Sequence, residues 1–301
     1  MLMTTIPTEL AETLAAVVDT GTMDAAARRL HITPSAVSQR IRVLEDRLGR
    51  VLLVRAKPAR PTEAGARVVR LARQYALLAQ DTLAELGAHA EADAGARAVT
   101  LPLAVNADSM ATWFLRPLAE VAGVHGVVFD LHRDDQDFTA SLLESGEVVA
   151  AVTSQAEPVP GCRVAALGTM RYEAVAVPPL AARIAADPAS VAVVDFDRRD
   201  ELQSRWLRGR GIDPVAPPRH YVPGSRDFTL AVEAGLGWGM LPEVQSADAL
   251  ATGRLERLGG APIDVPLYWQ QWSIESAILR ATADAVAAEA RRVLRAPVRS
   301  R

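Results

Sequence analysis

The stretch that decides the fold of this chain is Thr33-Pro34-Ser35-Ala36-Val37-Ser38-Gln39-Arg40-Ile41-Arg42-Val43-Leu44-Glu45-Asp46-Arg47-Leu48-Gly49. Residue chemistry marks both of its ends. A threonine such as Thr33 caps exposed backbone amides, and Pro34 suits the first helical position, where no amide donor is needed. Gly49 can take the left-handed conformation that ends a helix. The stretch is therefore predicted to be one helix.

The two faces of this helix differ in chemistry. An apolar stripe at helical spacing is expected to face a core, and it consists of Val37, Ile41, Leu44 and Leu48. The opposite face is polar and consists of Ser35, Ser38, Gln39 and Arg42. Such side chains hydrogen-bond base edges and phosphates, and they occupy the first turns, where a recognition helix meets the major groove. The polar face is therefore predicted to bind DNA.

Two shorter helices are expected before it. Apolar residues at helical spacing predict one helix from about Leu10 to Val18, and Thr22 can cap a second helix rich in alanine. Three helices with a tight turn between the second and third are the helix-turn-helix arrangement. Its expected core is Ala26, Ala27, Leu30, Val37 and Ile41. A generic three-helix bundle is the alternative, but it does not require a small-residue second helix, a proline-started third helix and a basic rim together.

A basic wing is expected next. The β-branched run Val51 to Val54 is followed by basic residues and prolines up to Pro61, which predicts two strands with a basic tip that reaches phosphates or the minor groove. With the flanks of the recognition helix, the further predicted DNA contacts are Thr33, Arg28, Arg55, Lys57 and Arg60. Residues 1–61 are therefore expected to form a winged helix-turn-helix domain.

A long helix should begin after Thr62 and run to about Glu91, within a linker of residues 62–94. Its apolar residues are Val68, Leu71, Tyr75, Leu78 and Leu86. A long helix with one apolar stripe requires a partner. We expect Leu71, Tyr75 and Leu78 to pack against a second copy of the chain, which would present two recognition helices to two half-sites. Packing on its own chain is the alternative.

Charge is distributed unevenly along the chain. The net charge is -3, yet residues 28–73 hold 12 Arg and Lys against 3 Asp and Glu. This basic segment coincides with the predicted recognition helix, which favours a phosphate footprint. The rest of the chain is acidic. With 301 residues and 50% hydrophobic content, the chain is long enough for two or three globular domains.

Several classes are disfavoured. No apolar run approaches the roughly 20 residues of a membrane span, and the amino terminus lacks a signal-peptide pattern, so a cytoplasmic protein without membrane contact is expected. Cys162 is the only cysteine, and the histidines lack ligand spacing, so neither a metal nor a cofactor is predicted. The glycines within Gly235 to Pro242 lack the context of a dinucleotide loop and are predicted to form a tight turn with close packing. No catalytic constellation stands out, so an enzyme is not expected.

From Val99 onward, short apolar runs alternate with helical segments, as in α/β units. The expected strands are 101–105, 127–131, 148–153, 172–177, 191–195, 220–222, 238–241 and 267–272. The chain is expected to cross between two lobes at Val177 to Pro179 and at Gly259 to Pro266. This divides residues 95–301 into lobe I, about 95–177 and 263–301, and lobe II, about 178–262. Ligands bind at the carboxyl ends of strands in such sheets, which favours the loops 106–109 and 153–154.

The whole chain resembles the LysR-type transcriptional regulators. The resemblance runs through Ala25 to Ile41, Leu44-Glu45, Leu48-Gly49 and Thr62 to Gly65. Within that family it is similar to the lysine- and arginine-responsive branch of ArgP- and LysG-like regulators. The residues that carry this narrower resemblance are Leu103 to Ser109, Asp135 to Asp137, Ala151 to Ser154, Gly168 to Tyr172 and Gly235 to Glu243. The resemblance implies a periplasmic-binding-protein-like effector domain, a dimer or tetramer, RNA polymerase as a partner, and an amino-acid exporter gene as the target.

The expected effector is L-lysine or L-arginine, held between the lobes, and most of this expectation comes from the resemblance. Its carboxylate can be bound by hydroxyls, by backbone amides at a helix start or by an arginine. Its cationic side chain can pair with carboxylates, and an aromatic ring can cover the aliphatic stem or stack on the cation. The predicted effector-binding residues are Asn106, Asp108, Ser109, Trp113, Asp134, Asp135, Thr153, Ser154, Arg171, Ser225, Asp227 and Phe228. For any single aspartate, capping a helix or facing water is the alternative. The competing function is a sequence-tolerant DNA-binding protein, such as an inhibitor of replication initiation.

Overall fold

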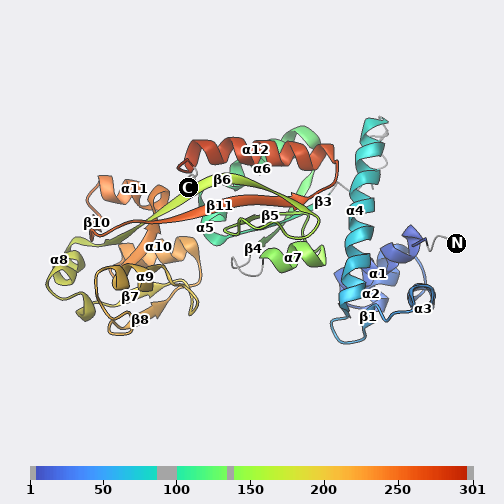
Figure 1. Ribbon diagram of the computed structural model, residues 1–301, viewed down its shortest axis with the longest axis horizontal. Helices are drawn as coiled ribbons and strands as arrows, with labels where there is room; N and C mark the ends of the chain where they lie inside the picture. Colours follow the sequence, from blue (N-terminus) through green and yellow to red (C-terminus); the bar gives the residue numbers. More distant parts are fainter. Residues whose placement is uncertain (1–4, 87–99, 134–138, 297–301) are drawn as a thin grey trace.

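The computed structural model describes residues 5–86, 100–133 and 139–296. Figure 1 shows a small helical domain at one end of a long upright helix, and beside that helix an elongated α/β body. The first part contains α1 (Thr8–Thr20), α2 (Met23–Leu30), α3 (Pro34–Leu48), β1 (Leu53–Val54), β2 (Arg60–Pro61) and α4 (Glu63–Glu85). The winged helix-turn-helix and the linker helix are thereby confirmed as elements of the fold.

The helix ends follow the capping chemistry of the sequence. The Thr33 hydroxyl accepts a hydrogen bond from the Ala36 amide at 3.2 Å, and Thr22 and Thr62 cap α2 and α4 in the same way. Gly49 ends α3 with φ of 63°. These contacts satisfy amides and carbonyls that a helix end leaves open. The boundaries of α3 are therefore set locally.

The core of the small domain agrees largely with the predicted stripe. Val37, Ile41 and Leu44 are buried, whereas Leu48 and Leu30 are only partly buried at its edge. The helix α4 adds three buried side chains to this core: Val68, Val69 and Ala72. The prediction that Val68 shares a stripe with Leu71 and Tyr75 was therefore wrong, because Val68 faces the domain while the other two are exposed. The helix also ends at Glu85, before the predicted Glu91, and residues 87–94 of the predicted linker lie outside the described residues.

The α/β body begins with elements that form lobe I. They are β3 (Thr100–Val105), α5 (Ala107–Thr112), α6 (Leu115–His125), β4 (Val128–Arg133), α7 (Thr139–Ser145) and β5 (Ala150–Thr153), joined later by α12 (Ala277–Val293). The strands β4, β3 and β5 are parallel, and the mostly apolar side chains of β3 and β5 suit a sheet covered on both faces. Figure 1 shows α6 and α12 side by side over one face of the sheet and α7 at the other.

Two long antiparallel strands connect this lobe with the other one. They are β6 (Cys162–Ala176) and β11 (Ile263–Trp272), which pair along their length with an irregularity at Leu267 and Tyr268. Lobe II contains α8 (Pro178–Ala186), η1 (Pro188–Ser190), β7 (Val193–Asp195), α9 (Leu202–Gly209), β8 (Arg219–Tyr221), α10 (Ser225–Glu233), β9 (Gly239–Pro242), α11 (Glu243–Ala251) and β10 (Glu256–Arg257). Because β6 also pairs with β9 and β10, one sheet extends from lobe I into lobe II.

All the expected strands occur, but two of them start several residues earlier than predicted. The strand β6 begins at Cys162 and not at Tyr172, and β11 begins at Ile263 and not at Leu267. Gly168, with φ of 150°, interrupts the alternation that would have revealed the first part of β6. The crossing between lobes is consequently made by paired strands, and Pro178 begins a helix. The short strand β10 was not predicted.

The first glycines of the segment Gly235 to Pro242 form a tight turn, as predicted, and its second half is the strand β9. Gly235 has φ of 79°, and a Cβ at Gly237 would lie 2.4 Å from the Ala192 carbonyl oxygen. The segment leads from α10 into β9, which is the wrong order for a dinucleotide loop. Among the described helices, none has the length and apolar character needed to cross a membrane.

Candidate functional site

A cavity of about 610 Å³ lies between the lobes, a size typical of small-molecule sites. Its walls come from residues that directly follow β3, β5 and β7, and from the first turns of α5, α9, α10 and α11. This is the position that parallel α/β units favour for a ligand, because strand carboxyl ends and helix amino termini meet there. The lining residues are Asn106, Ala107, Asp108, Arg133, Ser154, Tyr172, Phe196, Asp197, Arg199, Asp200, Glu201, Leu202, Arg205, Ser225, Phe228, Met240, Pro242, Gln245, Asp264, Val265 and Pro266.

Asp108 connects both lobes through the cavity wall. The Tyr172 hydroxyl donates to its Oδ2 and the Ser225 hydroxyl donates to its Oδ1, each at 2.6 Å. Gln245 Nε2 donates to the same Ser225 oxygen at 2.8 Å. Burial raises the pKa of Asp108, and the two hydroxyl donors oppose that rise. The arrangement concentrates negative charge at a place with little water, where a cation would be stabilised.

The loop after β7 supplies a second group of carboxylates. Asp200 Oδ2 accepts from the Phe196 amide at 2.9 Å, and its Oδ1 accepts from the Leu202 amide at 3.1 Å. Burial raises the pKa of Asp200, and these amide donors oppose the rise. Asp197 and Glu201 line the cavity from the same loop. The loop therefore holds Asp200 in a fixed position through its own backbone amides.

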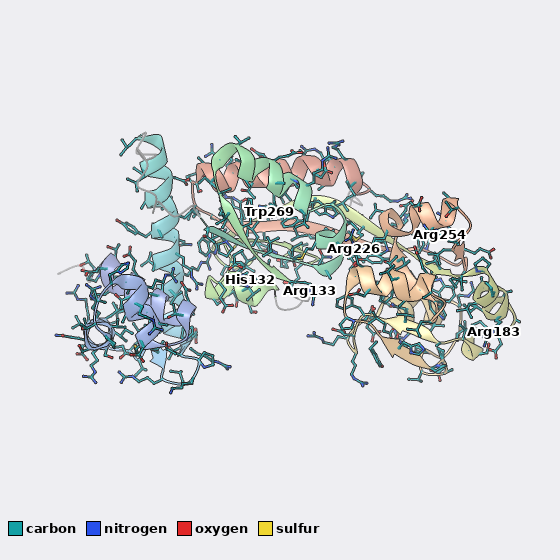
Figure 2. All side chains as sticks on the ribbon, turned by 180° about the vertical axis from the view of Figure 1, so that it is seen from behind. His132, Arg133, Arg183, Arg226, Arg254 and Trp269 are labelled. Carbon is teal, nitrogen blue, oxygen red and sulfur yellow. The ribbon has the colours of Figure 1, made fainter. Side chains whose placement is uncertain are left out.

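Arginines occupy other parts of the cavity wall. Arg133, at the end of β4, and Arg205, on α9, line the cavity with exposed side chains, and Figure 2 shows Arg133 on the side of lobe I that faces lobe II. Arg171 is committed elsewhere, because it makes a bidentate ion pair with Asp264 at 2.7 Å per bond. That ion pair lowers the pKa of Asp264. The cavity thus presents both charge signs, as a zwitterion with an additional positive group requires.

The predicted effector residues divide into three sets. Those that line the cavity are Asn106, Asp108, Ser154, Ser225 and Phe228. Those that the structure describes away from the lining are Ser109, Trp113, Thr153, Arg171 and Asp227. Asp134 and Asp135 lie outside the described residues.

The second set has clear reasons for its position. Trp113 is 2% exposed and stands edge-on to Phe114 with 5.7 Å between ring centroids, so it belongs to the lobe I core and does not cover the cavity. Ser109 is buried, and the Thr153 hydroxyl accepts from the Gln155 amide at 3.1 Å. Asp227 is exposed in the first turn of α10. The expected cluster of these side chains around a ligand is therefore not formed.

Several lining residues were missed from the sequence, chiefly the loop from Phe196 to Glu201. A usable signal was present, because the strand ending at Asp195 was predicted and ligands bind beyond strand carboxyl ends. Applied to that strand, the same rule would have selected the acidic loop. Tyr172 and Gln245 carry no such signal, because their positions depend on how β6 and α11 pack against the cavity.

The predicted DNA-contacting side chains lie on the surface of the small domain. Ser35, Gln39 and Arg42 are exposed on α3, and Ser38 is half-buried. Thr33 is exposed as well, although its hydroxyl caps the helix. The predicted basic flank and wing residues are all exposed: Arg28, Arg55, Lys57 and Arg60. This surface therefore offers hydrogen-bond donors and positive charge to a nucleic acid.

The linker helix also leaves apolar side chains uncovered in the single chain. Leu71 is 44% exposed, Tyr75 47% and Leu78 39%, all on α4. Large apolar groups that stand together on a helix are typical of an interface. Their predicted role in dimerisation stays a prediction.

Comparisons with known proteins agree with this architecture. Residues 8–66 match the bacterial regulatory helix-turn-helix protein, lysR family, and residues 94–291 match the LysR substrate binding domain. The HTH-type transcriptional regulator LysG of Mycobacterium tuberculosis is 46% identical over 294 residues, which cover 96% of this chain and 95% of that relative. The lysine export transcriptional regulatory protein LysG of Corynebacterium glutamicum is 43% identical over 281 residues, which cover 91% of this chain and 94% of that relative.

A solved structure extends the agreement to the whole fold. Full-length LysG from Corynebacterium glutamicum with bound effector Arg matches with a TM-score of 0.80 and 40% identity, over 96% of this chain and 100% of that one. Both domain families are thus present in the same order, and the similarity covers nearly the full length. The chain belongs to the LysR family of bacterial helix-turn-helix transcriptional regulators.

Proposed function

We propose that this chain regulates transcription by binding an operator in a manner that depends on L-lysine or L-arginine, and that its target is an amino-acid exporter gene. The observation that carries the proposal is the cavity of mixed charge between the lobes, in a chain that also exposes a recognition helix. A binding protein for small molecules needs only the first feature, and a plain DNA-binding protein needs only the second. A ligand-responsive regulator needs both.

The cavity chemistry suits a basic amino acid. The amino termini of α5 and α10, together with Arg133 and Arg205, favour the carboxylate of such a ligand. Asp108 and the acidic loop after β7 favour its ammonium or guanidinium groups. Phe196, Phe228 and Met240 provide apolar surface for the aliphatic stem. An acidic or purely apolar amino acid would leave these carboxylates without a counter-charge.

Relatives support the same assignment. The Corynebacterium glutamicum relative is named for lysine export, and its solved structure contains arginine as bound effector. We carry both properties to this chain as a proposal, since the identity extends over the effector region. Sequence-tolerant DNA binding, as in an inhibitor of replication initiation, gives no role to the cavity and is not favoured.

The partners follow from the same reasoning. The exposed apolar residues of α4 support a homodimer, or a tetramer built from two dimers, because a palindromic operator requires two recognition helices. RNA polymerase is the expected further partner if the chain activates its promoter. Both partners and a cytoplasmic location remain parts of the proposal.

Calorimetry of the full chain with lysine, arginine, glutamate and leucine tests the effector, and a mobility shift on the DNA upstream of its own gene tests the response. We expect lysine or arginine to bind, and the same amino acid to change the affinity or position of the shifted complex. Preferential binding of glutamate or leucine would contradict the effector assignment. Equal affinity for operator and random duplex at several salt concentrations would support the non-specific alternative.

A further inference from the structure

The linker helix α4 contributes to the cores of both domains. Val68, Val69 and Ala72 are buried in the helix-turn-helix core, whereas Leu77, further along the same helix, is buried in the core of the effector region. Figure 1 shows α4 upright, with α1 and α2 against its lower half and α7 as a neighbouring element of lobe I. Because a single helix joins the two cores, the position of the DNA-binding domain depends on how α4 is seated against lobe I.

Arg70 holds α4 against lobe I. Its Nη1 donates to the Pro160 carbonyl and its Nη2 donates to the Gly161 carbonyl, both at 3.1 Å. The same guanidinium lies 5.7 Å from the centre of the Trp272 ring. A planar guanidinium can bind two carbonyls and contact an aromatic ring at once, which an ammonium group cannot reproduce. Arg70 is therefore an anchor between α4 and the segment that leads into β6.

Arg73, one helical turn later, contacts both domains. Its Nη1 donates to the Gly146 carbonyl at the end of α7, and its Nη2 donates to Asp19 at the end of α1. Asp19 also accepts from Arg29 Nη1 at 2.9 Å, which extends the contact to α2. The Arg73 side chain is only 19% exposed. Both arginines were counted in the basic segment predicted to face phosphates, but these contacts direct them to lobe I and to α1.

Two glycines on lobe I allow α4 to come close to its surface. Gly146 has φ of 76°, and a Cβ there would lie 2.9 Å from the Cα of Arg70. Gly161 has φ of 74°, and its Cβ would lie 2.9 Å from Arg70 Nη2. At both positions a side chain would need a strained backbone. At Gly146 it would also push the α4 backbone away, whereas at Gly161 it would displace the Arg70 guanidinium from its carbonyl partners. The contact therefore depends on glycine at both places.

We propose that Arg73 is a positioning residue that couples lobe I to the helix-turn-helix domain, with Arg70 and Gly146 holding α4 in its seat. The proposal rests on the proposed function, because the signal that passes through this contact is the binding of the amino acid in the cavity. Ligand binding alters how lobe I presents the Gly146 carbonyl, and Arg73 transmits the change to Asp19 and from there to α2 and α3. Two sites influence each other only when a shared element has different contacts in the two states, and the proposal assigns that role to the Arg73 bridge.

The first test compares Arg73→Ala with Arg67→Ala in the full chain. Arg67 lies on the same helix, is 79% exposed and, within the described part of the chain, has Glu63 one turn away as its ion-pair partner, so it controls for the loss of one positive charge. We measure lysine and arginine affinity by calorimetry, and affinity for the DNA upstream of its own gene with and without the amino acid. Arg73→Ala should bind the amino acid as the wild type does. Coupled sites usually change each other's affinity by about 5- to 150-fold, and in this variant the ratio of the two DNA affinities should move at least threefold closer to one. Arg67→Ala should keep the ratio, and Arg73→Lys should restore only part of it.

The second test needs no ligand. Gly146→Ala and Gly126→Ala both place a side chain at positive φ, but nothing lies within 4 Å of a Cβ at Gly126. Small-angle scattering of the ligand-free chain should give a larger radius of gyration for Gly146→Ala than for Gly126→Ala and the wild type, because only the first pushes α4 from lobe I. If the wild type does not respond to lysine or arginine, the proposed effector fails, and this comparison alone decides whether the contact holds the domains together. An unchanged affinity ratio in Arg73→Ala, or identical scattering of both glycine variants, would overturn the proposal.

Discussion

At the scale of single residues, the polar face of α3 combines two kinds of side chain. Gln39 and Arg42 are fully available on the surface, whereas Thr33 is already occupied as a helix cap. A side chain that reads a base contributes to specificity, and one that contacts phosphate contributes to affinity for any sequence. The position of each side chain alone does not separate these roles, so a comparison of two DNAs is required.

Replacing Gln39 or Arg42 by Ala should weaken binding to the operator by about 1–3 kcal/mol if the residue reads a base, with a much smaller loss on random duplex. Mobility shifts on both DNAs at constant salt provide the measurement. Equal losses on the two DNAs would assign the residue to the phosphate backbone.

A second prediction at this scale concerns Asp108. Burial raises its pKa, so its carboxylate takes up a proton at higher pH than an ordinary aspartate. A protonated carboxyl no longer attracts a cation, and affinity for lysine or arginine should therefore decline as the pH falls from neutral toward the raised pKa. Asp108→Asn should lower the affinity at neutral pH by roughly 10-fold or more and should remove this pH dependence. Asp227→Asn, an exposed residue outside the cavity lining, is the control, and the same loss there would contradict the assignment.

Among the elements, α4 has two functions on different faces. One face completes the core of the small domain, and the other exposes Leu71, Tyr75 and Leu78. The sequence alone suggested one stripe because apolar residues occurred at near-helical spacing along the whole helix. The spacing could not show which residues face the chain's own domain, because that depends on where α1 crosses α4.

Leu71→Glu or Leu78→Glu should produce a monomer at micromolar concentration, because each variant would bury a charge between two helices. Sedimentation measures the mass, and operator binding should weaken with it because two linked half-sites are bound more tightly than one. Val215→Glu, at an 81% exposed position of lobe II, should change neither property. A wild-type chain that sediments as a monomer would refute the predicted interface.

The same scale shows how far the sequence determines the fold. Elements whose ends carry local signals, such as α3 with Thr33 and Gly49, were predicted to the residue. The first part of β6 was not, because its strand geometry comes from pairing with the distant β11. The cavity shows the same division, since Asn106 and Asp108 follow a predictable strand while Tyr172 and Gln245 reach the cavity only through packing.

In the whole molecule, an ion pair joins the two lobes beside the hinge strands. Arg295, beyond the end of α12, makes a bidentate pair with Glu243, the first residue of α11, at 2.9 and 2.8 Å. The hydrogen bonds from Arg295 lower the pKa of Glu243. Since the folded-state pKa is depressed, the stabilisation is present above the unfolded pKa of about 4.3 and is lost as the pH falls through the lower folded value.

Glu243→Gln should therefore cost a small amount of stability at neutral pH, because both side chains are partly exposed and solvent screens the pair. The difference from the wild type should vanish in acid. Urea unfolding at several pH values measures it. Glu275→Gln is the control for the loss of one surface carboxylate, since Glu275 is 74% exposed and pairs with Arg280 on α12 and with Arg163 on β6. A difference that grows as the pH falls would show that the sign of the argument is wrong.

The arginine contact between α4 and lobe I also contains a thiol whose reactivity can report whether the contact is closed. Cys162 is the only cysteine in the sequence, and its Sγ lies 3.7 Å from Arg70 Nη2 at that contact. The thiol is half-buried, and burial raises its pKa, so a thiol reagent should react slowly while α4 is seated. The rate at which Cys162 is labelled in the wild-type chain therefore measures how often α4 separates from lobe I. The rate can be compared with and without amino acid or DNA.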